Sequence, residues 1–229
     1  MLKTIIMAAG EGTRMKSNKS KVLHKLLNRE IIKYVVDASR FDESQTIIIG
    51  GKNKDDLNKI FSDDIIIEQK IGKDYPYGTG YAASLALNEI SDNDQVLVLN
   101  GDIPLITKSS LEEFISNHIE NDNSASVLST KVKNPINYGR IIRDDSGDFI
   151  GIVEHKDLKL NQDIINEINT GIYIFKGSDL KLALSKLDTN NEQSELYLTD
   201  CIEILYNDGK KVMAFTASDP DEFYGINNK

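Results

Sequence analysis

The sequence TIIMAAGEGTRM, residues 4–15, predicts how the fold begins, because an apolar run leads directly into a glycine-rich loop. Residues 4–9 have the nearly uninterrupted apolar character of a strand that is buried on both faces of a parallel sheet. Gly10 and Gly12 let backbone N–H groups approach phosphate oxygens, and Arg14 adds positive charge at the end of the loop. We therefore expect a strand, an anion-binding loop and then a helix.

Two familiar nucleotide-binding loops do not match this segment. A dinucleotide-binding fingerprint needs a third small residue where Met15 stands. A P-loop needs Gly-Lys followed by Ser or Thr, and the sequence contains no such triplet. A tight strand-to-helix turn that binds no ligand stays open on this segment alone.

The first half of the chain alternates between strand and helix patterns. Such alternation favours an α/β fold of the Rossmann-like, doubly wound type with a mostly parallel sheet. Thr79 is a candidate N-cap for one of the helices. Further strands are expected at 46–50, 65–68 and 95–99, and helices at about 31–40, 54–61 and 79–90.

The second half is richer in short strands separated by turns, which indicates a smaller β region. With no internal repeat and no Pro/Ser-rich linker, we expect a single domain over residues 1–229, whose two halves meet near residue 110. Strands are expected at 124–132, 139–143, 149–154, 169–175 and 212–215, and helices near 178–187 and 199–206.

Composition and charge argue against several classes of protein. The chain has 229 residues, a formal net charge of −9 and one cysteine, Cys201. The negative charge argues against nucleic acid and membrane surfaces as partners, and a single cysteine excludes an internal disulfide. No stretch approaches the ~20 apolar residues of a membrane span. The N-terminus lacks the cleavage region of a signal peptide, so we expect a cytoplasmic protein.

Positive charge is nevertheless concentrated in one segment. No acidic residue falls in the range 12–28, whereas five basic residues do: Arg14, Lys16, Lys19, Lys21 and Lys25. A cationic segment beside a glycine-rich loop suits a small polyanion such as a nucleoside triphosphate. A solvated surface loop is the alternative, above all for Lys16 and Lys19.

An aspartate follows an apolar strand of the first half. The run QVLVL, residues 95–99, leads into Asn100, Gly101 and Asp102. Ligands of open α/β sheets bind beyond the carboxyl ends of the strands, so we expect Asp102 at that edge. A carboxylate there suits Mg²⁺, which takes one or two protein oxygens and completes its shell with phosphates and water. A capping or turn aspartate is the alternative.

Eight short segments occur in a recognisable order along the chain. They are AAGEGTRM (8–15), KVL (21–23), GTG (78–80), GDIPL (101–105), YGRI (138–141), IVEHKD (152–157), EINTG (167–171) and ELYLTD (195–200). Together they resemble the sugar-1-phosphate nucleotidyltransferases, and among these the uridylyltransferase domain of the bifunctional N-acetylglucosamine-1-phosphate uridylyltransferase family. The resemblance covers essentially the whole chain.

The resemblance implies a nucleotide-binding half over about residues 1–110. Arg14 and Lys21 would be catalytic, because they would neutralise the triphosphate and the charge that develops at the α-phosphorus. Gln69 would read the uracil, and a side chain at Gly78 would crowd the base. The substrate contacts implied in this half are Met7, Ala8, Ala9, Gly10, Lys21, Gln69, Gly78, Thr79, Asn100, Gly101 and Asp102.

The resemblance also implies a sugar-binding half over about residues 111–229. Gly139 would offer backbone at close range, the carboxylate of Glu154 would accept hydrogen bonds, and the amide of Asn169 would donate and accept. Asn227 resembles a second metal ligand and would also contact substrate. Asp102 would be the first metal ligand and a catalytic residue, with Mg²⁺ as the cofactor.

The implied reaction joins UTP and N-acetylglucosamine-1-phosphate into UDP-N-acetylglucosamine and pyrophosphate, for peptidoglycan and lipopolysaccharide precursors. Asn100 and Tyr81 depart from the family's usual residues, and segment 70–77 is longer than expected, so another sugar phosphate or dTTP stays open. The alternative from another class is a non-catalytic sugar-nucleotide-binding module. The presence of Arg14, Lys21 and Asp102 argues against it.

The family's bifunctional members also carry an acetyltransferase β-helix domain built from hexapeptide repeats, and that domain assembles a trimer. No segment of this chain resembles those repeats. We therefore expect no acetyl transfer from this chain, and a monomer or weak dimer, with a trimer only where the β-helix domain is present.

Overall fold

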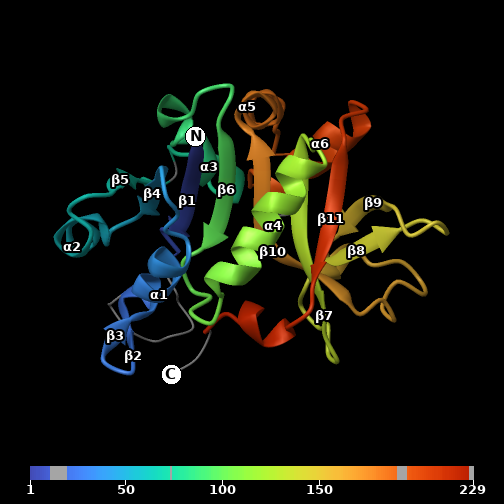
Figure 1. The fold of residues 1–229 in the computed structure, drawn as a ribbon, viewed down its shortest axis with the longest axis horizontal. Coiled ribbons are helices and arrows are strands. Elements are labelled where there is room, and N and C mark those ends of the chain that lie inside the picture. Colours follow the sequence, from blue (N-terminus) through green and yellow to red (C-terminus); the bar gives the residue numbers. More distant parts are fainter. Residues whose placement is uncertain (11–19, 73, 190–194, 227–229) are drawn as a thin grey trace.

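The computed structural model describes residues 1–10, 20–72, 74–189 and 195–226, and a large twisted sheet forms its centre (Figure 1). The apolar run after the N-terminus forms β1 (Leu2–Ala8), as expected. β1 lies between β4 (Ser44–Gly50) and β6 (Gln95–Asn100), and both pairings are parallel. Because all three strands run the same way, their carboxyl ends meet at one edge of the sheet.

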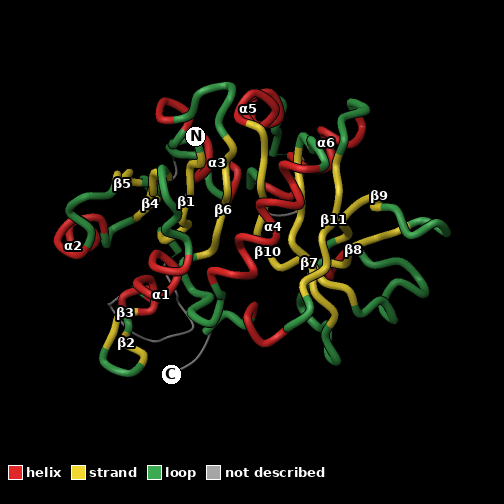
Figure 2. Tube along the Cα trace, viewed as in Figure 1, coloured by secondary structure: helices red, strands yellow, loops and turns green. Residues whose placement is uncertain are grey.

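The sheet is mostly parallel in its first half and mixed in its second. The main path of the strands is β11-β7-β10-β6-β1-β4-β5, and β10 is antiparallel to both β6 and β7. Figure 2 shows the hairpin of β8 and β9 extending from the sheet on the side away from β5. The remaining strands of this sheet are β5 (Ile65–Glu68), β7 (Ala125–Lys131), β8 (Arg140–Arg143), β9 (Phe149–Val153), β10 (Glu167–Lys176) and β11 (Val212–Ala217).

Helices cover both faces of the sheet, because successive strand residues point to opposite faces. Ile5 and Val98 pack on one face against α3, α5 and α6, whereas Ile6 and Leu97 pack on the other against α1, α2 and α4. The doubly wound α/β architecture is thereby confirmed. The helices are α1 (Ile31–Ala38), α2 (Lys54–Ile60), α3 (Thr79–Ser84), α4 (Lys108–Glu120), α5 (Gly177–Ser185) and α6 (Leu198–Asn207).

Three local features differ from the sequence-based expectations. α4 was not expected, and neither was the hairpin of β2 (Lys25–Leu26) and β3 (Arg29–Glu30). The helix expected over 79–90 divides into α3 and a 3-10 turn at Leu87–Glu89. Within the described ranges, no helix is long and apolar enough to cross a membrane.

Candidate active site

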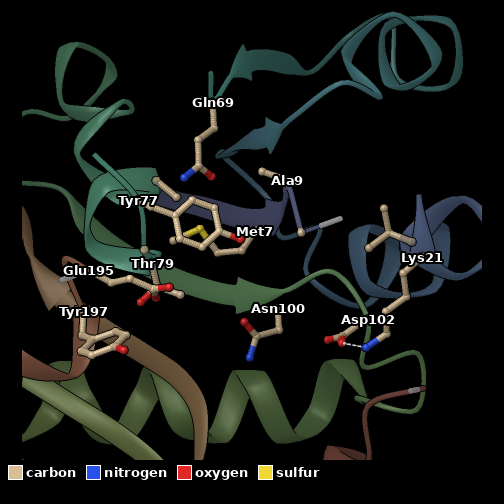
Figure 3. A pocket seen from close by; sticks show the side chains of 14 residues that line it. Met7, Ala9, Lys21, Gln69, Tyr77, Thr79, Asn100, Asp102, Glu195 and Tyr197 are labelled. Carbon is tan, nitrogen blue, oxygen red and sulfur yellow. Dashed lines mark hydrogen bonds and ion pairs between the residues drawn. The ribbon is translucent and has the colours of Figure 1, made fainter. Parts of the chain in front are cut away.

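A pocket of about 370 Å³ opens at the carboxyl ends of β1 and β6 (Figure 3). Gln69 lies at one side of it, and Asn100 and Tyr197 lie at the opposite side. Lys21 and Asp102 close a third side, where they face each other. The full lining is Met7, Ala9, Gly10, Lys21, Val22, Gln69, Tyr77, Gly78, Thr79, Ala82, Asn100, Asp102, Glu195 and Tyr197.

The side of the pocket around Gln69 suits a flat, polar group. Gln69 follows β5 and is buried, and its backbone N–H donates to the carbonyl of Gly50 at 2.7 Å. Its amide end points toward the ring of Tyr77, and the side chain of Met7 lies beyond that ring (Figure 3). An amide beside an aromatic ring and a thioether can both hydrogen-bond and stack with a planar ligand.

The wall at Gly78 is held by two backbone segments that pack against each other. Leu196 N–H donates to the carbonyl of Tyr77 at 2.8 Å, and Leu198 N–H donates to Thr79 Oγ1 at 3.0 Å. Gly78 has a φ of +116°, and a Cβ there would lie 2.3 Å from Leu196 O. Glycine is therefore required here by the neighbouring backbone, a reason that the sequence did not reveal. Gly78 rather than Thr79 occupies the N-cap position of α3.

The third side of the pocket carries charge (Figure 3). Lys21 begins a 3-10 turn (Lys21–Leu23) that is anchored by the buried side chains of Val22 and Leu23. Its ammonium forms an ion pair with Asp102, and both side chains are partly exposed, by 13% and 27%. A cation and a carboxylate that face a pocket together can bind a phosphate and a metal ion respectively.

Glycine and backbone contacts fix the position of Asp102. Gly101 N–H donates to Met7 O at 2.9 Å, and a Cβ on Gly101 would lie 2.9 Å from the same oxygen. Ile226 N–H donates to Asp102 O at 3.1 Å, which brings the end of the described chain to this edge. Arg14 and Asn227, expected from the sequence as catalytic residue and metal ligand, lie outside the described residues.

The residues expected to hold a sugar form a second group. Asn169 N–H donates to Gly139 O at 2.9 Å, and a Cβ on Gly139 would lie 3.4 Å from both carboxylate oxygens of Glu154. None of these three residues is among those that line the pocket of Figure 3. Burial, and after it the charge of Asp157, raises the pKa of the Glu154 carboxyl.

Asn100 and Tyr197 connect the pocket with this second group. Asn100 Nδ2 donates to Gly171 O in a long hydrogen bond of 3.5 Å. Gly171 follows Asn169 by two residues. Burial raises the pKa of Tyr197, and so do the charges of Glu195, Asp200 and Glu154, in that order. Tyr197 therefore lies within the electrostatic reach of Glu154 while it lines the pocket.

The structure brings most of the expected nucleotide contacts together and adds others. Ala8 is buried at the end of β1, and neither Ala8 nor Gly101 lines the pocket, whereas Ala9 and Gly10 do. The residues that line the pocket without having been expected as contacts are Val22, Tyr77, Ala82, Glu195 and Tyr197. The signal for Glu195 was its place in the segment ELYLTD; nothing local marks Ala82.

Known proteins are similar to this chain along most of its length. The family model described as nucleotidyl transferase matches residues 3–221. A bifunctional protein GlmU from Clostridioides difficile is 43% identical over 228 residues, which is 99% of this chain and 49% of that protein. Another from Acetivibrio thermocellus is 41% identical over 232 residues, 100% of this chain and 49% of that protein. The chain thus spans about half the length of these curated relatives.

Solved structures show the same fold at low sequence identity. A protein from Bacillus anthracis, described as a glucose-1-phosphate thymidylyltransferase, superposes with a TM-score of 0.74 at 20% identity, over 95% of this chain and 87% of that one. A UDP-glucose pyrophosphorylase superposes with a TM-score of 0.74 at 18% identity, over 97% and 93%.

These matches confirm the resemblance that the eight segments indicated. The family match covers most of the chain, and the relatives align with its whole length. The chain belongs to the nucleotidyl transferase family.

Proposed function

We propose that this chain is a uridylyltransferase that makes UDP-N-acetylglucosamine and pyrophosphate from UTP and N-acetylglucosamine-1-phosphate. The observation that carries the proposal is one pocket with the Gln69 amide on one side and the Lys21–Asp102 pair on another (Figure 3). The two sides match the two ends of a nucleotide, because the base can hydrogen-bond with an amide and the phosphates can pair with a cation. The relatives named bifunctional protein GlmU align with nearly the whole chain, which supports this choice of substrates.

In this proposal UTP lies with its base near Gln69 and Gly78 and its phosphates near Lys21. Ala9 and Gly10 also line the pocket, where small side chains let the chain approach the ligand closely. Arg14 belongs to the same glycine-rich segment and would add a second cation at the triphosphate. Each of these groups binds or orients, and none needs to form a covalent bond.

The sugar phosphate is proposed to lie between Asn100 and the group of Gly139, Glu154 and Asn169. Its phosphate oxygen is the nucleophile: a bond forms to the α-phosphorus of UTP, the α–β bridging bond breaks, and pyrophosphate takes the electron pair. Because the attacking phosphate is already an anion, no side-chain base is required. The chain's contribution is alignment of the two phosphates and neutralisation of charge by Lys21 and Arg14.

The donor groups at this edge fit Mg²⁺. Asp102 presents a partly exposed carboxylate to the pocket, and the described residues contain no cluster of three His, Cys, Asp or Glu that would enclose a metal by itself. A site that supplies one carboxylate suits a cation which keeps phosphate and water ligands. We propose Asp102 and Asn227 as its protein ligands, supported by the contact of the preceding Ile226 with Asp102. Bound there, Mg²⁺ would neutralise charge on the reacting phosphates.

The wider setting follows from the same proposal. Residues 1–110 would form the nucleotide half and residues 111–229 the sugar half of one domain, although Glu195 and Tyr197 of the second half also line the pocket. The product would serve cell-envelope synthesis in the cytoplasm. We propose that neither nucleic acid nor a membrane surface is a partner of this chain. We also propose that the chain is a monomer or a weak dimer.

The experiment is a product analysis with the purified chain and Mg²⁺. UTP and N-acetylglucosamine-1-phosphate should release pyrophosphate and yield UDP-N-acetylglucosamine by mass spectrometry. Competition with dTTP and with glucose-1-phosphate tests the substrate assignment, and a clear preference for either would replace it. Absence of pyrophosphate with every pair of substrates would contradict a catalytic role.

A further inference from the structure

Tyr173 places a phenol in the middle of the hydrophobic core. It lies on β10, opposite Val98 of β6 and Val127 of β7. The centroids of its ring and of the Phe175 ring are 6.1 Å apart. The residue is only 4% exposed. A hydroxyl in such surroundings is unfavourable unless it is hydrogen-bonded, so its partner identifies what the phenol contributes.

That partner is the side chain of Asn169. Asn169 Nδ2 donates to Tyr173 Oη at 2.8 Å, and Asn169 Oδ1 accepts from Gly171 N–H at 3.0 Å. A backbone N–H can only donate, so it fixes which end of the amide is the oxygen. Tyr173 Oη then accepts from the nitrogen end. Both ends of the amide are held, and only one orientation satisfies both contacts.

A bulge in β10 makes this contact possible. Between Asn169 and Ile172 the strand advances three residues, while its partner β7 advances one, from Ser129 to Leu128. Two extra residues are therefore looped out, one of them Gly171 with a φ of +77°. Residues four apart in a regular strand are separated by about 13 Å. The bulge shortens that separation, so the side-chain amide of Asn169 reaches the hydroxyl of Tyr173.

The amide keeps part of its hydrogen-bonding capacity. Asn169 has a second hydrogen on Nδ2 and a second lone pair on Oδ1 beyond the two contacts above. Asn169 lies beside Gly139, whose Cβ position faces the Glu154 carboxylate, in the group proposed to hold the sugar. Burial raises the pKa of Tyr173 well above its usual range, so the phenol stays neutral throughout the physiological pH range.

We propose that Tyr173 is a positioning residue, which holds the Asn169 amide in the orientation that binds the neutral polar groups of the sugar phosphate. Those groups are the hydroxyls and the N-acetyl amide of the sugar, because a neutral amide pairs with them in both directions. The inference rests on the proposed function, in which Asn169 contacts the sugar. It assigns a role to a buried residue that does not touch substrate.

A double-mutant cycle tests this role. Tyr173→Phe, Asn169→Ala and the double variant are compared by the KM for N-acetylglucosamine-1-phosphate, the KM for UTP and the thermal midpoint. Tyr173→Phe should raise the KM for the sugar phosphate about fivefold to tenfold and leave the KM for UTP unchanged. In the Asn169→Ala background the same change should have no further effect, because the group that it positions is gone.

Tyr34→Phe is the matched control, since it removes a hydroxyl that donates to Leu26 O at 2.8 Å on a different part of the fold. It should alter neither KM. Additive effects in the cycle, or an equal rise in both KM values, would overturn the positioning role. Wild-type turnover of the two substrates tests the proposed function separately, so failure of one is distinguishable from failure of the other.

A second measurement does not depend on turnover. The side-chain amide signal of Asn169, assigned in an NMR spectrum through Asn169→Ala, should shift on addition of N-acetylglucosamine-1-phosphate. Tyr173→Phe should move the signal in the free protein and weaken the response to the ligand. An unchanged Asn169 signal in folded Tyr173→Phe would contradict the proposal.

Discussion

The two ends of β6 carry polar residues that are used differently. At the amino end, Gln95 Oε1 and His118 Nε2 are 3.0 Å apart, and His118 Nδ1 lies 2.9 Å from Ser126 Oγ. His118 and Ser126 are buried, and Gln95 is half-buried. At the carboxyl end, Asn100 and Asp102 border the pocket (Figure 3). One strand thus presents hydrogen-bonded polar groups at one end and pocket-facing groups at the other.

This difference separates groups that stabilise the fold from groups available to a substrate. His118 is 1% exposed, and both of its ring nitrogens have partners within the chain. Asp102 keeps 27% of its side chain exposed although it is paired with Lys21. Substitutions at the first end should change stability and leave turnover intact, whereas those at the second end should do the reverse.

The largest effect is expected for Asp102→Ala, compared with Asp94→Ala at the other end of the same strand. Asp102→Ala should lower kcat by on the order of 100-fold or more with an unchanged thermal midpoint, because it removes the proposed metal ligand. Asp94 accepts from Ser91 N–H at 2.8 Å and lies 3.3 Å from the N-terminal ammonium of Met1. Asp94→Ala should therefore cost stability, about 1 to 3 kcal/mol, and keep kcat.

Steady-state kinetics and thermal denaturation of the two variants measure both quantities, and circular dichroism controls for folding. A Mg²⁺ titration of the rate should also show a weakened metal dependence for Asp102→Ala alone. Equal losses of kcat in both aspartate variants would break the division between the two ends.

Lys21→Ala should have the next largest effect, with Lys25→Ala as its control. Lys21 lines the pocket, and loss of a cation that is proposed to face the transferring phosphate should lower kcat about 100-fold. Lys25 is 55% exposed and 3.8 Å from Glu30, a surface contact of little energetic weight. Single-turnover rates at saturating UTP should separate the two lysines. Similar small losses at both would show that the cationic segment acts only by diffuse attraction.

The first half of the fold was predictable because its signals are local. The run 4–9 is apolar enough to specify a buried strand, and Asp102 follows a second apolar run, so both were expected at the ligand-binding edge. The sequence shows that Gly101 is a glycine, but it does not show that this residue lies close to the carbonyl oxygen of Met7. A pattern along the chain reports the period of an element and gives no information on its neighbours in space.

Elements whose stability depends on tertiary contacts were harder to predict. α4 places Leu111, Phe114 and Ile115 at helical spacing against the core, a signal that the many polar residues between and around them obscure. Thr107 at its N-cap was a second signal, since its hydroxyl accepts from Ser110 N–H. The bulge after Asn169 gave no signal beyond Gly171.

Gly78→Ala should affect nucleotide binding less severely than the charged variants affect turnover. The new Cβ would lie 2.3 Å from Leu196 O, so the segments that form this wall must separate. We expect the KM for UTP to rise about tenfold, because the wall of the proposed base site moves. Gly72→Ala is the control in the same loop, since its Cβ would meet only Tyr75, at 3.8 Å. An unchanged KM in folded Gly78→Ala would show that the wall tolerates the displacement.

The smallest effect on turnover is expected at His118, where the result should be a change in the pH dependence of stability. Burial, and after it the charge of Lys176, lowers the pKa of His118 to about 4, and Asp122 partly opposes this. In the unfolded chain the histidine pKa is near 6.5. Between about pH 6.5 and pH 4 the unfolded chain therefore binds a proton at His118 that the folded protein does not bind. Stability is therefore fully present above about pH 6.5 and is lost as the pH falls toward 4.

Between pH 7.5 and pH 5.0 this single group should cost about 2 kcal/mol of unfolding free energy. His118→Gln retains a neutral polar side chain and has no such proton, so it should lack that component, whereas all other titrating groups are shared with the wild type. Urea denaturation of both proteins at the two pH values isolates the difference, and kcat at pH 7.5 should be the same for both. An identical loss of stability in wild type and variant would mean that His118 is protonated without cost. The network at the amino end of β6 would then be more open than its hydrogen bonds indicate, and the contrast with the pocket end would weaken accordingly.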